Sequence, residues 1–177
     1  QLRHHNGIVF EGHSTDYQLP EALRAMVRDG VGILKVGPEL TFALREGLFA
    51  LQYINSCLGG NIDFIETLDS IMLSKPHIWQ HYYTGSPADI ALKRKFSYSD
   101  RWRYCAADKQ VADAAQMLCS NLNEKAVPLT LLHQFLPEQY MKIRRDHLKN
   151  NTAEIVKDKV KAVLQKYYSA VAESSVI

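Results

Sequence analysis

The stretch that decides the fold is GIVFEGHSTDYQ, residues 7–18, in which a short apolar run passes directly into polar side chains. The apolar run at residues 7–10 is typical of a strand buried on both faces, as in a parallel sheet. A tight turn needs only Gly, Asn or Pro, whereas residues 11–16 bring acids, an imidazole and hydroxyls. Polar groups at the carboxyl end of a buried strand are typical of enzyme sites in β/α folds. We therefore predict a strand over residues 7–12 that ends in a candidate site.

A second strand and helix follow the first pair. Pro20 at a first helical position and Gly30 after the last turn predict a helix between them. The apolar run VGILKV, residues 31–36, predicts the second strand, and Pro38 opens a helix that runs to about Leu58. The buried stripe of that helix is expected at Leu40, Leu44, Leu48, Leu51, Ile54 and Leu58. Strand, helix, strand and helix with short connections indicate a β/α fold with parallel strands.

The alternation of strands and helices stops after Gly60. Further amphipathic helices are expected to begin near Asn61, Asp108 and Thr152, to include Trp79 and to cover residues 131–140. Two strands alone would expose hydrogen-bonding edges and make only a marginal sheet. Because the chain starts with Gln1, we expect the remaining strands upstream of it or in another chain. The predicted fold class is α/β, with residues 1–58 forming β/α units and residues 59–177 forming a helical extension.

The composition limits the classes of partner. The 177 residues suffice for a domain with a core, and the formal net charge is only +2. Such a balance argues against nucleic acid and anionic membranes as main partners. No apolar run approaches the roughly 20 residues that cross a bilayer, and no signal peptide is visible. Cys57, Cys105 and Cys119 form no CxxC pair, so we interpret them as reduced thiols of a cytoplasmic protein.

Several motifs carry a family resemblance. They are EGHSTDYQ (11–18), ILKVGPELTFALREGLFAL (33–51), FSYSDRWRY (96–104), LLHQFLPEQY (131–140) and YYSAVAE (167–173). Together they resemble the GatZ/KbaZ family, the non-catalytic subunit of tagatose-1,6-bisphosphate aldolase, over nearly the whole chain. Members of that family are longer, and the match falls on their carboxyl-terminal part. The resemblance implies that residues 1–58 are the last two β/α units of a TIM (β/α)8 barrel, followed by a mostly helical extension.

The resemblance also implies a function. A GatZ/KbaZ-like chain is expected to act as a chaperone-like subunit that supports a catalytic tagatose-bisphosphate aldolase subunit without being a catalyst itself. Its pathway would be galactitol or N-acetylgalactosamine catabolism through tagatose 6-phosphate, in the cytoplasm and as an oligomer. Two alternatives stay open: an active zinc-dependent class II ketose-bisphosphate aldolase or other sugar-phosphate enzyme, and a structural partner without a ligand. Some members carry an older tagatose-6-phosphate kinase label, but these residues contain no Walker A pattern GxxxxGK(S/T).

The family's distant similarity to class II aldolases suggests site residues. In those enzymes one strand ends in His-Gly-(Gly/Ala)-Ser, which supplies a zinc ligand and a phosphate loop. The next strand ends in Lys-(Ile/Val)-Asn and completes the phosphate site. By position, His13 matches the zinc ligand, while Ser14, Thr15 and Asp16 occupy the phosphate loop. Ser14 stands in place of a glycine and Gly37 in place of the asparagine, which argues against catalysis by this chain.

Each of these candidates also has a purely structural interpretation. His13 is either a zinc ligand or a histidine hydrogen-bonded at the barrel mouth. The loop hydroxyls and Asp16 bind a phosphate or satisfy backbone donors of a turn. Gly37 precedes a helix whose free N–H groups suit an anion, unless Glu39 in the first turn takes that benefit. Arg101, in a basic and aromatic run, reaches a phosphate at the mouth or pairs with an acid nearby.

The helices beyond residue 60 are rich in aromatic side chains. Examples are Trp79, Tyr82, Tyr83, Trp102 and Tyr140. Trp and Tyr are favoured interface anchors because they bury much area at little entropic cost. We expect some of them to face another subunit, either a second copy or the catalytic aldolase, and the alternative is that they pack within the chain.

Overall fold

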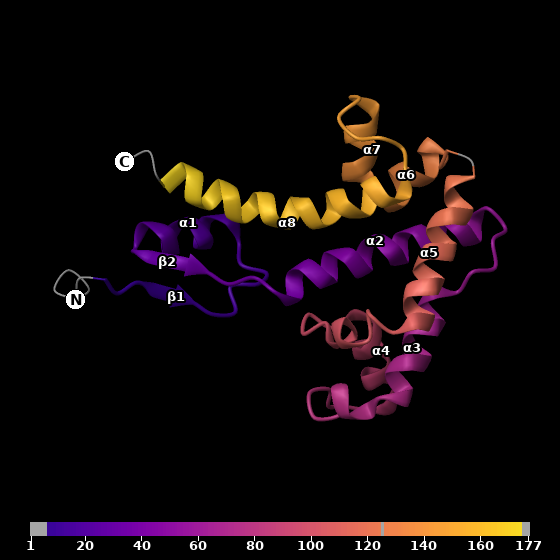
Figure 1. The fold of residues 1–177 in the computed structure, drawn as a ribbon, viewed down its shortest axis with the longest axis horizontal. Coiled ribbons are helices and arrows are strands. Elements are labelled where there is room, and N and C mark those ends of the chain that lie inside the picture. The colour runs from indigo at the N-terminus through magenta and orange to yellow at the C-terminus, as the bar shows by residue number, and fades with distance from the viewer. Residues whose placement is uncertain (1–6, 125, 175–177) are drawn as a thin grey trace.

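The computed structural model describes residues 7–124 and 126–174. The molecule is elongated, with the strands at one end and most of the helices at the other (Figure 1). Its elements are β1 (Phe10–Gly12), α1 (Pro20–Arg28), β2 (Val31–Leu34), α2 (Pro38–Cys57), α3 (Phe64–Ser74), the 3-10 helix η2 (Pro76–Ile78), α4 (Pro87–Phe96), the 3-10 helix η3 (Arg101–Tyr104), α5 (Lys109–Asn123), α6 (Leu129–Phe135), α7 (Pro137–Arg144) and α8 (Thr152–Ser174). Each helix of the described chain is too short or too polar to span a bilayer.

The first four elements form two β/α units. Strands β1 and β2 pair in parallel, with Glu11 opposite Ile33 and Gly12 opposite Leu34. Both α1 and α2 begin with a proline, whose fixed φ and missing N–H suit the first helical position. The predicted order of strand, helix, strand and helix is therefore confirmed, and so is the parallel direction of the strands.

Both strands are shorter and more exposed than the sequence predicts. The side chains of Ile8, Val9 and Phe10 are more than half exposed, and Ile33 of β2 is 45% exposed. Helices α1 and α8 pack together on one side of the strands, around a small cluster of buried residues that includes Leu23. The described residues thus show two parallel strands in a mostly helical fold, and the barrel portion is not seen among them.

Several helices of the extension begin at a side-chain cap. Asp108 caps α5, as predicted, because its carboxylate accepts a hydrogen bond from a first-turn amide. The predicted start at Asn61 is wrong, since Asp63 caps α3 instead. Thr152 is the first residue of α8, and the side chain of Asn151 accepts the first-turn amides there. The helices predicted from Pro20 and Pro38 begin at those residues. The short helix predicted to include Trp79 is wrong, because η2 ends at Ile78, and residues 131–140 are divided between α6 and α7.

The main hydrophobic core lies among the helices and not at the strands. Its most buried members include Leu51, Ile54, Phe64, Leu68, Met72, Leu118, Leu132 and Ile155, from α2, α3, α5, α6 and α8. Helix α8 then runs back along α2 to reach α1, so that its carboxyl-terminal half lies over the two β/α units (Figure 1). The last helix of the extension is thus part of the packing around the strand ends.

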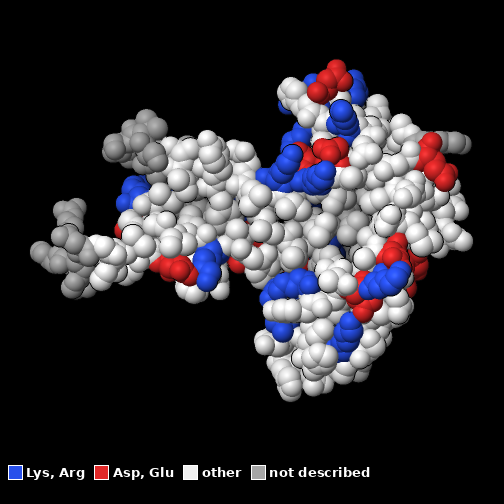
Figure 2. Space-filling model, in the orientation of Figure 1, with Lys and Arg blue, Asp and Glu red and all other residues white. Residues whose placement is uncertain are grey.

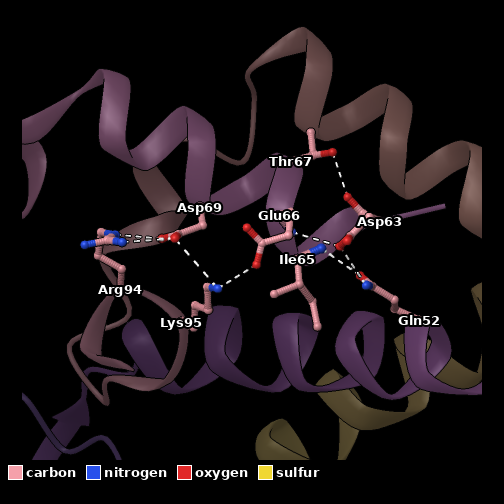
Figure 3. Close-up of polar contacts among 8 residues, drawn as sticks. All are labelled: Gln52, Asp63, Ile65, Glu66, Thr67, Asp69, Arg94 and Lys95. Atoms are coloured by element: carbon pink, nitrogen blue, oxygen red, sulfur yellow. Dashed lines mark hydrogen bonds and ion pairs between the residues drawn. The ribbon is translucent and has the colours of Figure 1, made fainter. Parts of the chain in front are cut away.

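A polar network joins α2, α3 and α4 (Figure 3). The Gln52 amide nitrogen of α2 donates to Asp63 Oδ1 over 2.8 Å. Arg94 of α4 donates from Nε and Nη2 to the two oxygens of Asp69 over 2.6 and 3.0 Å, and Lys95 Nζ lies 3.7 Å from Asp69 Oδ2. A bidentate arginine–carboxylate pair fixes orientation as well as distance. The network therefore fixes the lobe formed by α3 and α4 against α2.

A buried ion pair connects α2 with the turn before η3. Arg45 Nε donates to Asp100 Oδ1 over 2.8 Å, and both side chains are at most 2% exposed. The guanidinium lies over the rings of Phe42 and Phe49, at 4.4 and 5.2 Å from their centroids. Burial raises the pKa of Asp100, and the charge of Arg45 opposes that rise. Asp100 also has a left-handed backbone, with a φ of 47°.

Candidate functional site

The loop between β1 and α1 carries four of the predicted site residues, His13 to Asp16. Ser14 and Tyr17 adopt the left-handed conformation, with φ values of 55° and 62°. That conformation costs a non-glycine residue about 1–3 kcal/mol, so it persists only where surrounding contacts hold the backbone. The contacts that hold this loop come from the start of α2 and from α8.

Asp16 closes the space between the loop and the first turn of α2. Its Oδ1 accepts hydrogen bonds from the backbone amides of Gly37 and Glu39, each over 2.9 Å. These amides lie at the positive end of α2, where an external anion would otherwise be favoured. The Gly37 amide, which the sequence suggested for a phosphate, is therefore engaged by the chain's own carboxylate. Phosphate binding at this turn stays a prediction that requires Asp16 to move.

Thr15 has a structural position within the loop. Its side chain is buried, and Oγ1 donates to the Lys35 carbonyl over 2.7 Å. The Tyr167 hydroxyl of α8 donates to the Thr15 carbonyl over 2.7 Å and lies 3.1 Å from Thr15 Oγ1. Burial raises the pKa of Tyr167, which keeps the phenol protonated as the donor. Thr15 thus faces the last helix, whereas its neighbour Ser14 is exposed.

A second connection to α8 passes through Glu39. One oxygen of the Glu39 carboxylate accepts the backbone amide of Tyr17 over 2.8 Å, and the other pairs with Lys166 Nζ. Lys166 also donates to the Gln18 carbonyl over 3.2 Å. Both side chains of the ion pair are mostly buried, at 17% and 12% exposed, so it is less screened by solvent than a surface pair. The loop is therefore clamped between α2 and a helix that begins more than 130 residues later in the sequence.

Three titratable side chains meet at the strand ends, and we call them the Glu11–His13–Lys35 cluster. Glu11 Oε1 lies 2.9 Å from His13 Nε2 and 2.9 Å from Lys35 Nζ. The hydrogen bond from Lys35 and the nearby positive charges lower the pKa of Glu11. An imidazole oriented by a carboxylate beside an ammonium can contact anionic oxygens or exchange a proton. This cluster is the arrangement at the strand ends that remains open to a ligand.

Arg101 lies on η3, and its contacts are all local. Its Nε donates to the Ile78 carbonyl over 2.8 Å. The guanidinium carbon lies 3.7 Å from the ring centroid of Tyr82 and 4.7 Å from that of Tyr104. None of these partners belongs to residues 13–16. The loop does reach the segment before η3, because the Tyr17 hydroxyl donates to the Tyr98 carbonyl over 2.7 Å. Phosphate binding by Arg101 at the strand ends stays an untested prediction.

A comparison with known proteins decides the family. The model of the family described as D-tagatose-1,6-bisphosphate aldolase subunit GatZ/KbaZ-like matches residues 1–172. The chain belongs to the GatZ/KbaZ-like family. It is also similar to the crystal structure of a probable tagatose 6 phosphate kinase from Sinorhizobium meliloti 1021, with 43% sequence identity and a TM-score of 0.91. That similarity covers 96% of this GatZ/KbaZ-like chain and 44% of the solved one, so our chain spans less than half of its length.

The described residues of this GatZ/KbaZ-like chain do not complete the zinc site that the class II aldolases have. A catalytic zinc takes three protein ligands. His13 is accompanied only by Glu11, and no group of three His, Cys, Asp or Glu side chains within residues 7–124 and 126–174 could hold a metal ion. The Lys35 ammonium beside the Glu11 carboxylate would also repel a cation. Zinc at His13 therefore stays a prediction that needs ligands from outside the described residues.

Sequence reasoning matched Lys35 to the Lys-(Ile/Val)-Asn motif of the class II aldolases but did not pair it with Glu11, although a signal for the pair was present. In two parallel strands that both end in polar residues, the carboxyl ends meet at the same edge of the sheet. His13 and Lys35 come directly after β1 and β2, so the pairing places them beside each other. Charges of opposite sign at neighbouring strand ends are therefore a usable signal for this GatZ/KbaZ-like site.

Proposed function

We propose that this GatZ/KbaZ-like chain belongs to the non-catalytic subunit of D-tagatose-1,6-bisphosphate aldolase and supports the activity and stability of the catalytic subunit. Beside family membership, one observation carries the proposal. The backbone N–H groups that could bind an anion at the strand ends are already hydrogen-bonded to a carboxylate of the same chain. Asp16 occupies the amides of Gly37 and Glu39 at the start of α2. A subunit that must bind a substrate phosphate there would leave those donors free.

The proposal includes the completion of the sheet. We infer that β1 and β2 are the last two strands of a (β/α)8 barrel whose other strands lie outside the described residues. The parallel order and the exposed apolar residues Ile8, Val9 and Phe10 support this inference, because open strand edges are otherwise a liability. The greater length of the solved relative agrees with it. The assembly would be oligomeric and cytoplasmic, in the tagatose 6-phosphate pathway of galactitol or N-acetylgalactosamine breakdown.

A second candidate function is sugar-phosphate binding, with or without catalysis, at the Glu11–His13–Lys35 cluster. It is favoured by the exposure of all three side chains, of which His13 is 70% and Lys35 55% exposed. Cationic groups at the carboxyl ends of barrel strands commonly serve phosphates. The kinase name of the solved relative belongs to that protein, and no Walker A pattern in our sequence supports a transfer from ATP.

Mixing the full-length protein with the catalytic aldolase subunit tests the main proposal. A partner that binds the native state of the catalytic subunit raises its thermal midpoint by mass action. We expect a higher midpoint and a higher aldolase activity as the GatZ/KbaZ-like protein is added. Unchanged midpoint and activity up to tens of micromolar, a range that detects moderate affinities, would reject the accessory role. Inorganic phosphate titrated against the parent and a Lys35→Met variant tests the second candidate.

A further inference from the structure

The surface around η3 carries two arginines that have no carboxylate partner among the described residues. Arg101 is held by a carbonyl and by the Tyr82 and Tyr104 rings. Arg103 Nη1 donates to the Ser99 carbonyl over 2.6 Å, and Nη2 donates to the Tyr104 hydroxyl over 3.0 Å. Arg45 of α2 and Arg94 of α4, in contrast, are each paired with an aspartate. The positive charge around η3 is therefore not neutralised by the chain's own acids.

The electrostatics of Tyr104 reflect this excess charge. The hydrogen bond from Arg103, together with the charges of Arg103 and Arg101, lowers the pKa of the Tyr104 phenol. Figure 2 shows Lys and Arg side chains on the lobe formed by α3 and α4, on its side toward the strands, with the acidic atoms of that lobe mainly on its other side. A surface with a local excess of positive charge attracts an acidic partner.

The same surface is rigid and aromatic. Trp102, between the two arginines, is 2% exposed, so η3 is anchored in the core. The backbone amide of Arg101 donates to the buried Tyr83 hydroxyl over 3.2 Å. By contrast, Tyr82 and Tyr104 are 59% and 55% exposed. Arginine and tyrosine side chains that are already held in place lose little entropy on binding, which is the character of interface hot spots.

The shape of the surface favours a macromolecular partner over a small molecule. Four clefts among the described residues are each lined by residues other than Tyr82, Arg101, Arg103 and Tyr104. A net charge of only +2 on the chain provides little of the general attraction on which nucleic-acid binding depends. Carboxylates of a protein, in contrast, can pair with the remaining guanidinium N–H groups while tyrosine rings bury apolar area.

We propose that Tyr82, Arg101, Arg103 and Tyr104 form a docking surface for an acidic segment of the catalytic aldolase subunit. We call it the arginine–tyrosine surface. The identity of the partner rests on the proposed function, whereas its acidic chemistry rests on the unpaired arginines. Of the aromatic residues predicted to face another subunit, Tyr82 is exposed and available to a partner. Tyr83 and Trp102 are buried and pack within the chain.

The test is the dissociation constant between the full-length protein and the catalytic subunit, measured for the parent and for an Arg101→Glu/Arg103→Glu double variant. Arg144→Glu is the matched control, because Arg144 is exposed and donates to the Tyr140 hydroxyl over 3.0 Å in the same manner. We expect the double variant to bind at least about tenfold more weakly, which corresponds to about 1.4 kcal/mol. The control should stay within about twofold of the parent. Raised salt should weaken the parent more than the double variant.

The possible results separate the docking surface from the proposed function. If the parent binds and the double variant binds equally well, the arginine–tyrosine surface is refuted while the accessory role stands. If the parent does not bind up to tens of micromolar, both proposals fail. If single-stranded DNA displaces the catalytic subunit from the parent, the surface is a general polyanion site and the proposal of a protein partner is overturned. Should the charge reversal impair folding, Arg101→Gln/Arg103→Gln replaces it, with the same expected direction.

Discussion

The substitution Asp16→Ala should convert the start of α2 into an anion site. It removes a carboxylate that accepts two amides of the first turn at 2.9 Å each. Loss of such a cap costs about 0.5–2 kcal/mol, and loss of a negative charge at a helix amino end costs about 0.3–1 kcal/mol. A total near 2 kcal/mol corresponds to a fall in thermal midpoint of about 4–8 °C for a protein of this size.

The informative part of this experiment is rescue by phosphate. In the variant the freed amides of Gly37 and Glu39 should bind the added anion, and binding to the native state restores stability. With a dissociation constant on the order of 10 mM, 100 mM phosphate would return about 1.4 kcal/mol, or about 3–6 °C. The assay is thermal unfolding of parent and variant in phosphate and in chloride at equal ionic strength. Equal stabilisation of both proteins by phosphate would refute the argument that Asp16 occupies the site.

Three further predictions concern stability. Asp100→Asn keeps a residue that tolerates the left-handed backbone but removes the negative charge beside the buried Arg45, so the free energy of unfolding should fall by about 3 kcal/mol. The control Asp113→Asn, in an exposed ion pair, should lower that free energy by less than about 0.5 kcal/mol. Equal losses in the two variants would refute the importance of the buried pair. Tyr167→Phe removes the phenol that donates to the Thr15 carbonyl, which should cost about 1–2 kcal/mol and speed amide hydrogen exchange in the loop after β1. Unchanged exchange would contradict the clamp. The hydrogen bond from Lys75 holds the pKa of Asp108 below its ordinary value of 3.8. The ionised Asp108 therefore stabilises the fold fully above pH 3.8, and this stabilisation is lost as the pH falls through the lowered pKa. The difference in thermal midpoint between the parent and Asp108→Asn should therefore be constant at neutral pH and shrink below about pH 4, whereas a difference that grows on acidification would reverse the sign.

The β/α order could be predicted because its signals are local. Pro20 and Pro38 mark the helix starts, Gly30 marks a helix end, and the apolar runs between them mark the strands. The Ser86 and Asp89 capping box that begins α4 is an equally local signal. The predicted burial of the two strands is not found among the described residues. Burial on both faces depends on further strands and covering helices, and the described residues include no further strand.

The candidate site could be located but its contacts could not. The sequence reasoning assigned Asp16 to a phosphate-binding loop, and only the fold shows that its carboxylate turns onto the amides at the start of α2. The contact between Thr15 and Tyr167 joins residues 152 positions apart, and no periodic pattern carries such information. Pairing of Glu11 with Lys35 depended on the register of two strands, which a sequence fixes only when one face is buried.

The central claim is that this chain supports an aldolase without performing its chemistry. The most direct measurement is the aldolase activity of the catalytic subunit reconstituted with full-length protein, either parent or carrying Glu11→Gln, His13→Ala and Lys35→Met together. We predict that both reconstituted complexes are equally active within about twofold and that both exceed the catalytic subunit alone. A loss of about 100-fold or more, the scale on which general acid–base groups act, from a variant that still binds the catalytic subunit would contradict the account and make the Glu11–His13–Lys35 cluster part of an active site.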